Sequence, residues 1–492
     1  MGIDLGTTAT KVGLFEATTG ELVAFARYDY HATSPAPGWS EMQIENYWDA
    51  AVTAARQALN DSGRPQVLGI GISSQGQTFV PLDDRHRPLR PSIVWLDTRA
   101  EDQAARLRSV FDPDGYSRRT GLPFPSAIES AAKLLWLREN EPDVWLGTRS
   151  VVLLPDYLGL RLTGQRRIDL NNAASTGMVD QSLGDWWPEA FAAVGAPAQW
   201  MSPIGRPGEV IGALQPEAAE ELGLPHGIPV VLGSNDQLSG AVGVGNVRAG
   251  LASGTVGTAM AIVSTLAEIP ADARRGITWG RHPVADLFFL LAYAKTSGML
   301  LTWLRDLAAP RSTYEELLAE AEHVPPGSDG LVCLPHFSGT ATPTFRTEVR
   351  GGFVGLTLGH RRAHLVRAVA EAVCFASRDI ISLTGRAGQP ATALRMLGGA
   401  TRSDFWMQML ADVVQVPLEV PKCSEASVLG SALFAGVGAG RFGSVCEGAH
   451  AFYRPGRSFA PRPHMASQYD SAYATYRQAM ERLYPGALGA GT

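Results

Sequence analysis

The chain carries little charge for its length and has no excess of positive charge. Of its 492 residues, 18% are charged, and Lys plus Arg (42) are fewer than Asp plus Glu (48), which gives a net charge of −6. Nucleic acid is bound through rows of Lys and Arg that neutralise phosphates, so this balance argues against nucleic acid as a main partner. The 45% hydrophobic content supports sizeable cores and excludes a disordered chain.

Cysteine and long apolar runs are also scarce. The four cysteines form no C-x-x-C pair, which favours free thiols in a reducing compartment. The longest apolar run, residues 287–292, is far too short to cross a membrane, and the N-terminus lacks the basic and apolar regions of a signal peptide. We therefore expect a cytoplasmic protein with no membrane partner.

Several motifs that would mark an enzyme class are missing. There is no G-x-x-x-x-G-K-[ST] phosphate loop, no H-E-x-x-H zinc helix and no G-x-S-x-G nucleophile turn. His360 and His364 lie four residues apart, but the residues between them are Arg-Arg-Ala, so a metal site is not expected there. Arg361, Arg362 and Arg367 are typical of a solvated helix face.

Strand and helix patterns alternate along the chain, which predicts an α/β fold. Residues 11–16 and 21–27 are strand-like and flank a four-residue turn, so we expect a β-hairpin. Apolar residues at steps of three and four predict helices over 48–59 and 366–380, the second ending near Gly385. Short apolar runs predict buried strands at 67–72, 93–96, 151–154 and 230–232.

A glycine-rich stretch near the middle of the chain is the best candidate for a domain boundary. Six glycines fall within residues 240–257, and a new apolar segment follows them. We expect one domain over residues 1–244 and a second over 245–492, with the last helix packing back on the first domain. A weak internal echo suggests duplication, because residues 4–8 and 253–258 both place Gly and Thr ahead of an apolar strand.

The first candidate for chemistry is Asp4-Leu-Gly6-Thr7-Thr8, with Lys11 three residues later. Glycine lets the backbone turn close to an anion, and Thr hydroxyls with backbone amides can hold phosphate oxygens. A neighbouring carboxylate can hold a hydrated magnesium ion. An ordinary hairpin turn explains the same residues, so the pattern alone leaves both interpretations open.

A double glycine follows a predicted strand in the second half of the chain. The segment 398–403 (Gly-Gly-Ala-Thr-Arg-Ser) comes after the apolar run 394–397 and before a predicted helix at 405–414. Such an order brings backbone against a flat ligand. The segment is not G-x-G-x-x-G, so it carries no dinucleotide fingerprint and is weak by itself.

An aspartate lies at the end of another predicted strand. Asp236 follows the strand at 230–232, within Gly-Ser-Asn-Asp-Gln (233–237). A carboxylate at the carboxyl end of a strand is well placed to act as a base in a cleft. Aspartate is also a common helix N-cap, and these residues alone favour the cap.

In their order along the chain, these segments resemble the FGGY carbohydrate kinases, a family with the actin and hexokinase ATPase fold, and among them the xylulokinases. Residues 4–11 are similar to the family's first phosphate loop, 253–257 to the second, 398–403 to the adenosine motif, and 235–237 to the segment with the catalytic aspartate. Further landmarks are Trp39-Ser-Glu41, Trp95-Leu-Asp-Thr-Arg99, Lys133-Leu-Leu-Trp136, Leu154-Pro-Asp-Tyr-Leu158, Ser338-Gly-x-x-Thr-Pro343 and Gly351-Gly-Phe-Val-Gly-Leu356.

The resemblance implies two RNase-H-like domains with ATP and a sugar in a deep interdomain cleft. It implies ATP-dependent phosphorylation of a sugar or polyol hydroxyl, with Asp236 as general base and Mg²⁺ held by Asp4 and Asp236. A homodimer is the expectation for the family. The residues that the resemblance assigns to ATP and its phosphates are Gly6, Thr7, Thr8, Lys11, Gly254, Thr255, Gly398, Gly399, Ala400 and Ser403.

The acceptor site is where this sequence departs from the xylulokinases. Gly76 and Gln77 replace a Met-His pair, so we expect Gly76 to open space and Gln77 to hydrogen-bond a substrate hydroxyl. D-Xylulose is the leading acceptor, and another sugar or polyol, such as ribulose or erythritol, is the alternative. A hypothesis of another class, a non-catalytic nucleotide-binding sensor, would require the loss of Asp4 or Asp236. The residues that the resemblance assigns to the substrate are Gln75, Gly76, Gln77, Trp95, Asp97, Asp236 and Gln237.

Overall fold

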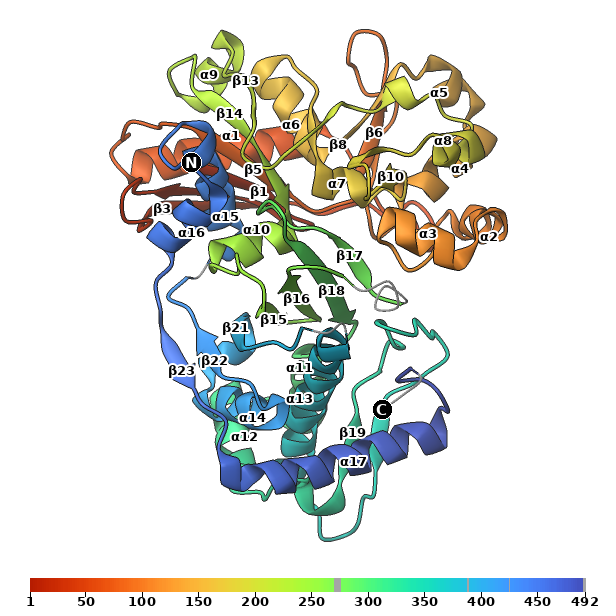
Figure 1. Ribbon diagram of the computed structural model, residues 1–492, viewed down its shortest axis with the longest axis vertical. Coiled ribbons are helices and arrows are strands. Elements are labelled where there is room, and N and C mark those ends of the chain that lie inside the picture. The colour runs from red at the N-terminus through yellow and green to blue at the C-terminus, as the bar shows by residue number, and fades with distance from the viewer. Residues whose placement is uncertain (270–275, 387–388, 424, 490–492) are drawn as a thin grey trace. The chain divides into compact units, whose positions relative to one another are not determined.

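The computed structural model describes residues 1–269, 276–386, 389–423 and 425–489. The chain divides into two compact units, each with its own mixed sheet (Figure 1). None of the helices in the described ranges combines the length and the hydropathy that a membrane span needs, and no disulfide joins the described cysteines. Unit 1 consists of Met1–Val247, Gly280–Asp286 and Glu425–Tyr453, and unit 2 of Arg248–Trp279, Leu287–Ser424 and Arg454–Thr492.

Unit 1 is built on a six-stranded sheet in the order β13-β14-β5-β1-β2-β3. The pairs β1–β2 and β2–β3 are antiparallel, whereas β5 runs parallel to β1 and β14 runs parallel to β5. The β2–β3 pair confirms the predicted hairpin, and β5 and β14 confirm two of the predicted buried strands. The strands are β1 (Gly2–Leu5), β2 (Ala9–Phe15), β3 (Leu22–Asp29), β5 (Ile70–Ser74), β13 (Val210–Ala213) and β14 (Pro229–Asn235).

A helix from near the end of the chain completes this sheet. Helix α15 (Ala426–Gly438) packs against β1, β5, β14 and α10 (Asp236–Gly243), and its blue ribbon lies beside α10 in Figure 1. The approach is so close that a Cβ on Gly71 would lie 2.0 Å from the carbonyl oxygen of Ser431. Only glycine permits such contact between a strand and a helix. The helix predicted over 48–59 is α1 (Glu45–Asp61), which packs on β2 and β3.

Unit 1 has a second core, which lies on a four-stranded sheet in the order β4-β7-β6-β8. The strand predicted at 93–96 is shorter than expected and ends at Ile93, because a turn begins there. The elements are β4 (Glu41–Met42), β6 (Phe79–Leu82), β7 (Ser92–Ile93), β8 (Ser150–Leu153), β9 (Ile168–Asp169), β10 (Val179–Asp180), β11 (Asp185–Trp186), β12 (Ile204–Gly205), α2 (Glu101–Val110), α3 (Pro113–Thr120), α4 (Ser130–Asn140), α5 (Pro142–Gly147), α6 (Leu154–Thr163), α7 (Leu170–Ala174), α8 (Pro188–Val194), α9 (Pro216–Leu222) and α16 (Val445–Phe452).

Unit 2 repeats the strand order of unit 1. Its sheet runs β17-β18-β16-β15-β21-β22-β23, with β15, β16 and β18 antiparallel and with β21 and β22 parallel to β15. The order β18-β16-β15-β21-β22 is that of β3-β2-β1-β5-β14, which agrees with the duplication suggested by the sequence echo. The strands are β15 (Leu251–Val256), β16 (Met260–Leu266), β17 (Thr278–Arg281), β18 (Phe288–Ala294), β19 (Val332–Leu334), β20 (Gly352–Val354), β21 (Ala393–Leu397), β22 (Leu418–Val420) and β23 (Arg457–Phe459).

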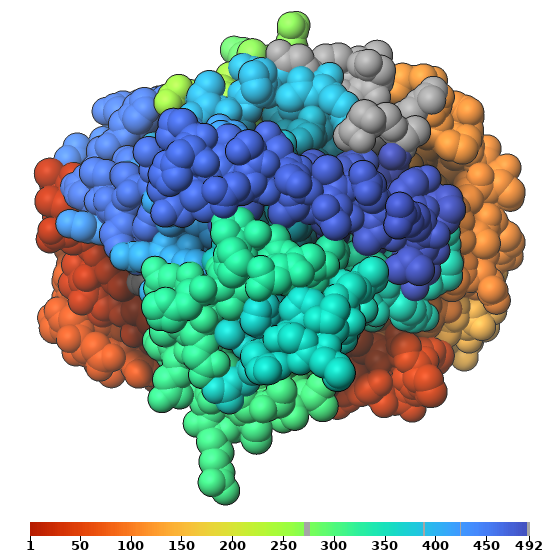
Figure 2. Space-filling view, turned by 90° about the horizontal axis from the view of Figure 1, so that it is seen from below, coloured from red at the N-terminus to blue at the C-terminus, as the bar shows by residue number. Residues whose placement is uncertain are grey.

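The helices of unit 2 gather around α13 (Arg362–Arg386), the long helix that the sequence predicted. Its apolar residues at steps of three and four are buried, and α11 (Met299–Ala308), α12 (Tyr314–Glu322) and α14 (Asp404–Val414) pack on it. The last helix, α17 (Ala466–Leu483), crosses one face of unit 2 as a dark blue ridge in Figure 2. The expectation that the last helix packs back on the first domain is therefore wrong, because α17 packs on α13, α14 and β19 instead.

Candidate active site

Asp4 lies in β1, where its carboxylate is almost fully buried. The register of the β1–β2 pair places it opposite Lys11. Its Oδ2 accepts a hydrogen bond from Ser427 Oγ at 2.7 Å, whereas Oδ1 is buried without a hydrogen-bond partner in the part of the chain that the structure describes. Burial raises the pKa of Asp4, and the Ser427 hydrogen bond and the Lys11 charge oppose that rise. A buried carboxylate oxygen without a donor suits a cation.

Lys11, predicted to bind phosphate, forms an ion pair with Glu425. Its Nζ lies 2.8 Å from Glu425 Oε2, and both side chains are partly exposed. Glu425 directly precedes α15, so one segment supplies both Glu425 and the Ser427 that bonds Asp4. Lys11 and Glu425 are 414 positions apart in the chain, and Asp4 and Ser427 are 423 apart. No local sequence pattern could therefore have predicted either contact. A partly exposed ion pair is weak, and phosphate binding by Lys11 stays a prediction.

Asp236 is the first residue of α10, directly after β14. The helix N-cap is Asn235, whose side-chain oxygen accepts a hydrogen bond from Gln237 N at 3.1 Å, so the N-cap interpretation of Asp236 is wrong. Asp236 Oδ1 also accepts from Gln237 N, at 2.7 Å. Burial, followed by the charge of Asp4, raises the pKa of Asp236 to about 7. A carboxylate with that pKa is suited to general-base chemistry near neutral pH.

A series of three hydrogen bonds links Trp95 through Thr7, in the β1–β2 turn, to Gln75 and Tyr47. The indole Nε1 of Trp95 donates to Thr7 Oγ1 at 2.9 Å, and Thr7 Oγ1 donates to Gln75 Oε1 at 2.8 Å. Gln75 Nε2 donates to Tyr47 OH at 3.1 Å. The Gln75 side chain is buried and holds the turn in place, so the structure does not support its predicted contact with the substrate. Thr8, at the tip of the turn, is exposed.

Gln77 lies in the turn after β5 with a φ of 60°, which is uncommon for any residue other than glycine. Its backbone N donates to Ser175 Oγ at 3.1 Å, and its carbonyl oxygen accepts from Ser130 Oγ at 3.0 Å. The expectation that Gly76 opens space is wrong, because a Cβ there would lie 2.8 Å from Ser175 Oγ. Gln77 and Gln237 are partly exposed and stay predicted contacts for a substrate hydroxyl.

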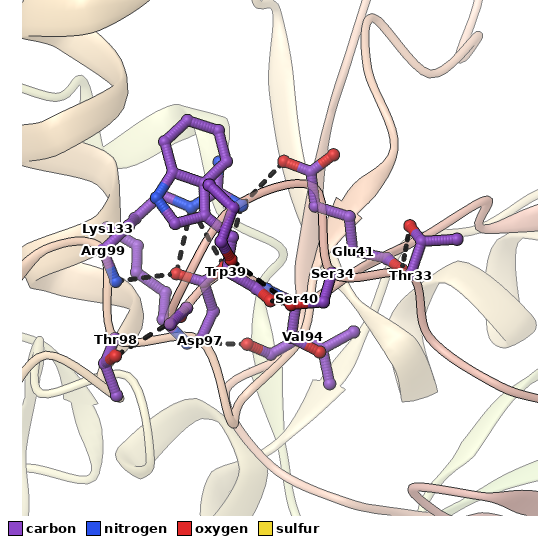
Figure 3. Close-up of polar contacts among 12 residues, drawn as sticks. Thr33, Ser34, Trp39, Ser40, Glu41, Val94, Asp97, Thr98, Arg99 and Lys133 are labelled. Atoms are coloured by element: carbon purple, nitrogen blue, oxygen red, sulfur yellow. Dashed lines mark hydrogen bonds and ion pairs between the residues drawn. The ribbon is translucent and has the colours of Figure 1, made fainter.

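Asp97 has a structural role that sequence reasoning missed (Figure 3). Its carboxylate is fully buried, accepts a hydrogen bond from Ser40 N at 2.6 Å and forms an ion pair with Arg99 at 2.8 Å. The Arg99 guanidinium also reaches Glu41 and stacks 3.7 Å from the ring centre of Trp39. The structure therefore does not support the predicted contact of Asp97 with the substrate.

Lys133 completes the same buried cluster. Its Nζ donates to Val94 O at 2.9 Å and to Trp95 O at 3.1 Å. Burial lowers the pKa of Lys133 to about 7, and the charge of Asp97 opposes that fall. Lys133 thus fixes the backbone of Trp95, a predicted substrate residue whose indole reaches Thr7.

Unit 2 contains a pocket of about 730 Å³ beside the β15–β16 turn. Gly399, Ala400 and Ser403, which were predicted to bind ATP, line it. The Ser403 hydroxyl also caps α14, accepting a hydrogen bond from Trp406 N at 3.2 Å. Sequence reasoning missed the walls that Met299, Trp303 and Tyr314 supply; the apolar residues of the segment that forms α11 were a signal for the first two, whereas Tyr314 begins α12.

Not every residue predicted to bind the nucleotide lines this pocket. Gly254 is buried within β15, and Thr255 is exposed outside the pocket lining. Gly257 and Thr258, in the turn itself, line it instead. Gly398 has a φ of 93° and shapes the turn behind Gly399, a conformation that glycine adopts without strain.

Known proteins match the chain along most of its length. Residues 1–243 match the N-terminal domain of the FGGY family of carbohydrate kinases, and residues 251–439 match its C-terminal domain. The chain belongs to this family. Xylulose kinase from Rhodospirillum rubrum has a similar structure, with a TM-score of 0.92, 32% identity and 99% of each chain covered.

Other relatives of this FGGY kinase are named for two different substrates. Xylulose kinase of Escherichia coli (strain K12) is 30% identical and covers 99% of each chain, and gluconokinase of Bacillus subtilis (strain 168) is 27% identical and covers 88% of this chain and 86% of that protein. The predicted enzyme class, an ATP-dependent sugar kinase, is confirmed by these matches. So is the two-domain α/β fold.

Proposed function

We propose that this FGGY kinase transfers the γ-phosphoryl group of ATP to a hydroxyl of a neutral ketose or polyol, with D-xylulose as the leading acceptor. The observation that carries the proposal is the pair of carboxylates in unit 1: Asp236, with its pKa raised to about 7, within the field of the buried Asp4. The similarity to xylulose kinases supports D-xylulose, and the similarity to gluconokinase supplies the competing acceptor, gluconate.

The side chains around the turn at Gly76 and Gln77 support the proposal of a neutral acceptor. Ser130 and Ser175 hold Gln77, and Ser175 and the amide of Asn235 lie against Gly76. Hydroxyls and amides pair well with sugar hydroxyls, whereas an acid such as gluconate is better met by a cation. The contacts of Gly76 and Gln77 named here include no Lys or Arg side chain, which favours a ketose or polyol over an aldonate.

The chemical step needs a base and stabilisation of charge. An acceptor hydroxyl is a weak nucleophile, so Asp236 takes its proton while the acceptor oxygen forms a bond to the γ-phosphorus. The bond from the γ-phosphorus to the bridging oxygen breaks, and ADP leaves. Thr7, Thr8 and Lys11, around the β1–β2 turn, would supply hydroxyl and ammonium donors to the phosphate oxygens.

The residues of unit 1 fit a magnesium ion. Asp4 Oδ1 is a buried oxygen without a donor among the described residues, and Asp236 is the second carboxylate. No group of three or more His, Cys, Asp and Glu side chains suited to a metal occurs in the described ranges. Two carboxylates are sufficient, because Mg²⁺ binds through one or two of them and keeps water and phosphate ligands. When bound, the ion would neutralise charge on the phosphates.

The nucleotide would bind in unit 2. The 730 Å³ pocket has the apolar and aromatic walls that suit a purine, and the exposed backbone of Gly399 allows a flat ring to approach closely. ATP as phosphoryl donor follows from the family, and the adenosine contact of Gly399 is our proposal. A cytoplasmic location and a homodimer stay predictions, and the second can be checked by light scattering.

The test is a panel of acceptors with ATP and magnesium, in which ADP formation is measured with D-xylulose, D-ribulose, erythritol, glycerol and D-gluconate. We expect the highest kcat/KM for D-xylulose and the lowest for gluconate. A preference for gluconate would contradict the neutral-acceptor proposal. Binding of ATP without turnover of any acceptor would favour the nucleotide sensor, which the presence of both Asp4 and Asp236 makes the weaker hypothesis.

A further inference from the structure

We propose that Ser130 and Ser175 are positioning residues that hold Gln77 in its unusual conformation and thereby set the selectivity for the acceptor. The inference rests on the proposed function, because it assumes that the turn at Gln77 faces the acceptor. It concerns two serines that the sequence comparison did not single out, together with the reason why residue 76 is glycine.

Gln77 is the centre of a strained turn. Thr78 N donates to Gly76 O at 2.7 Å, which closes a three-residue turn around Gln77, and the φ of Gln77 is 60°. Turns of this kind with positive φ are rare and strained, since the side chain crowds the backbone. Such strain persists only where the surroundings impose it, and it is found most often at functional sites.

Two hydroxyls impose this conformation from opposite sides of the residue. Ser175 Oγ accepts from Gln77 N at 3.1 Å and donates to Asn172 O at 2.7 Å, so it is itself anchored at the end of α7. Ser130, at the start of α4, donates to Gln77 O at 3.0 Å. Both peptide groups of Gln77 are therefore tied to helices, which fixes the direction in which its side chain leaves the turn.

Gly76 is the residue that lets Ser175 reach Gln77. A Cβ on Gly76 would lie 2.8 Å from Ser175 Oγ and 3.3 Å from Asn235 Nδ2. Any side chain at residue 76 would therefore push Ser175 away from the Gln77 amide. Asn235 directly precedes Asp236, so the turn lies against the segment that carries the proposed base. Gly76, Ser175 and Gln77 thus act as one unit beside that base.

The partly exposed amide of Gln77 offers one donor group and one acceptor group to a ligand. Held by two serines, it would recognise a pair of neighbouring hydroxyls on a neutral acceptor. Specificity of this kind depends on the orientation of the side chain, because a polar group that does not reach its partner loses the hydrogen bond and still has to be desolvated.

The first experiment is a double-mutant cycle on the acceptor that the wild-type enzyme uses best. Ser175→Ala should lower kcat/KM for that acceptor by about tenfold, mainly through its KM, with the KM for ATP unchanged. Gln77→Ala should give a similar loss. In the Gln77→Ala background, adding Ser175→Ala should lower kcat/KM by less than about twofold, because no amide side chain is left to be oriented. Losses that multiply in full would overturn the proposal.

A matched control separates the orientation of Gln77 from the general stability of the fold. Ser62→Ala removes a hydroxyl that bonds only carbonyls at the end of α1, so kcat/KM should not change. Thermal unfolding of each variant completes the comparison. If Ser175→Ala lowers the Tm but leaves kcat/KM intact, Ser175 supports the fold and does not position Gln77.

A second cycle tests the role of Gly76 independently. Gly76→Ala should lower kcat/KM by about tenfold in the wild type but have little further effect in the Ser175→Gly variant, which has no side chain to displace. Equal losses in both backgrounds would contradict the inference. If gluconate proves to be the best acceptor, the proposed function fails, yet the two cycles with gluconate still decide whether the serines act through Gln77.

Discussion

The two units share one strand order but carry different chemistry at the corresponding turns. In unit 1 the β1–β2 pair places Asp4 opposite Lys11, so charges of both signs flank the turn. In unit 2 the β15–β16 pair places Gly254 opposite Ile262, and the pocket beside that turn is largely apolar. The strand order is set by apolar alternation and by close-packed glycines, whereas the chemistry depends on a few residues at the strand ends, which can change without changing the fold.

The buried acids of the two units differ in the same way. In unit 1, Glu129, Asp156 and Asp236 have pKa values raised to about 7, chiefly by burial. In unit 2, burial also raises the pKa of Glu371 and Asp379, but each carboxylate lies 2.8 or 2.7 Å from an arginine nitrogen, and that positive charge opposes the rise. The acids named here whose pKa lies near neutral pH belong to unit 1, whereas the largely apolar pocket of unit 2 suits a nucleotide base.

The largest expected effect is the loss of the proposed base. Asp236→Ala should lower kcat by roughly 10²–10⁴-fold, the usual contribution of a general base, and should change ATP binding less, because Asp4 remains to hold the magnesium ion. Steady-state kinetics and nucleotide titration measure the two quantities. Asp112→Ala, which removes the N-cap of α3 and an exposed ion pair with Arg118, is the control and should keep kcat. A kcat near the wild-type value in Asp236→Ala would mean that the carboxylate takes no part in the mechanism. The assignment of proton chemistry to unit 1 would then be wrong.

Asp97→Ala should lower stability rather than substrate affinity. It leaves Arg99 and the Ser40 amide without their buried carboxylate partner. Removing one partner of a comparable buried ion pair lowers the free energy of unfolding by about 3–5 kcal/mol. Urea unfolding measures this loss, and the KM for the acceptor, taken well below the unfolding midpoint, should stay near normal. Asp29→Ala, in an exposed pair with Arg27, serves as the control with nearly unchanged stability. A raised KM with normal stability would restore Asp97 as a substrate residue.

The pH dependence of stability should reveal the raised pKa values in unit 1. Burial raises the pKa of Glu129 from 4.5 to about 7, so its stabilising contribution is present below pH 4.5 and is lost as the pH rises through 7. Glu129→Gln stays neutral throughout. The free energy of unfolding of the variant, minus that of the wild type, should be about 2–3 kcal/mol larger at pH 8 than at pH 5. A difference that does not change with pH would mean that Glu129 titrates normally.

The smallest expected effect concerns the pocket of unit 2. A Cβ on Gly399 would meet open space, so Gly399→Val should fold normally and fill part of the pocket. We expect the KM for ATP to rise roughly tenfold, about the effect of 1.4 kcal/mol, with the KM for sugar unchanged. Gly385→Val, at an equally open site near the end of α13, is the control. Equal changes in both KM values would mean that the pocket does not serve the nucleotide alone.

The sequence alone was enough for features that depend on local pattern. Period-two and period-three-and-a-half spacing located the β2–β3 hairpin, α1 and α13, because each element buries one face wherever it packs. The order of short motifs was enough for the family, since glycines and aspartates at strand ends are constrained by the backbone geometry of the turn.

Arg367 shows where local pattern fails. It was expected on a solvated face, yet it is 3% exposed, pairs with Glu371 at 2.8 Å and donates to Tyr469 OH at 2.8 Å. Tyr469 comes from α17, a hundred residues away, so nothing near Arg367 in the chain indicates burial. Asp97 is a similar case, because its partner Ser40 is supplied by a distant segment.

The tertiary structure decided the environment of each site residue. The return of α15 to unit 1 brought Glu425 to Lys11 and Ser427 to Asp4, and the ends of α4 and α7 brought two serines to Gln77. Such contacts join residues tens to hundreds of positions apart, and they depend on packing between elements rather than on the preference of any one segment. The sequence by itself therefore determined which family and which reaction class this chain has, while packing determined which of its polar side chains are left to meet a ligand.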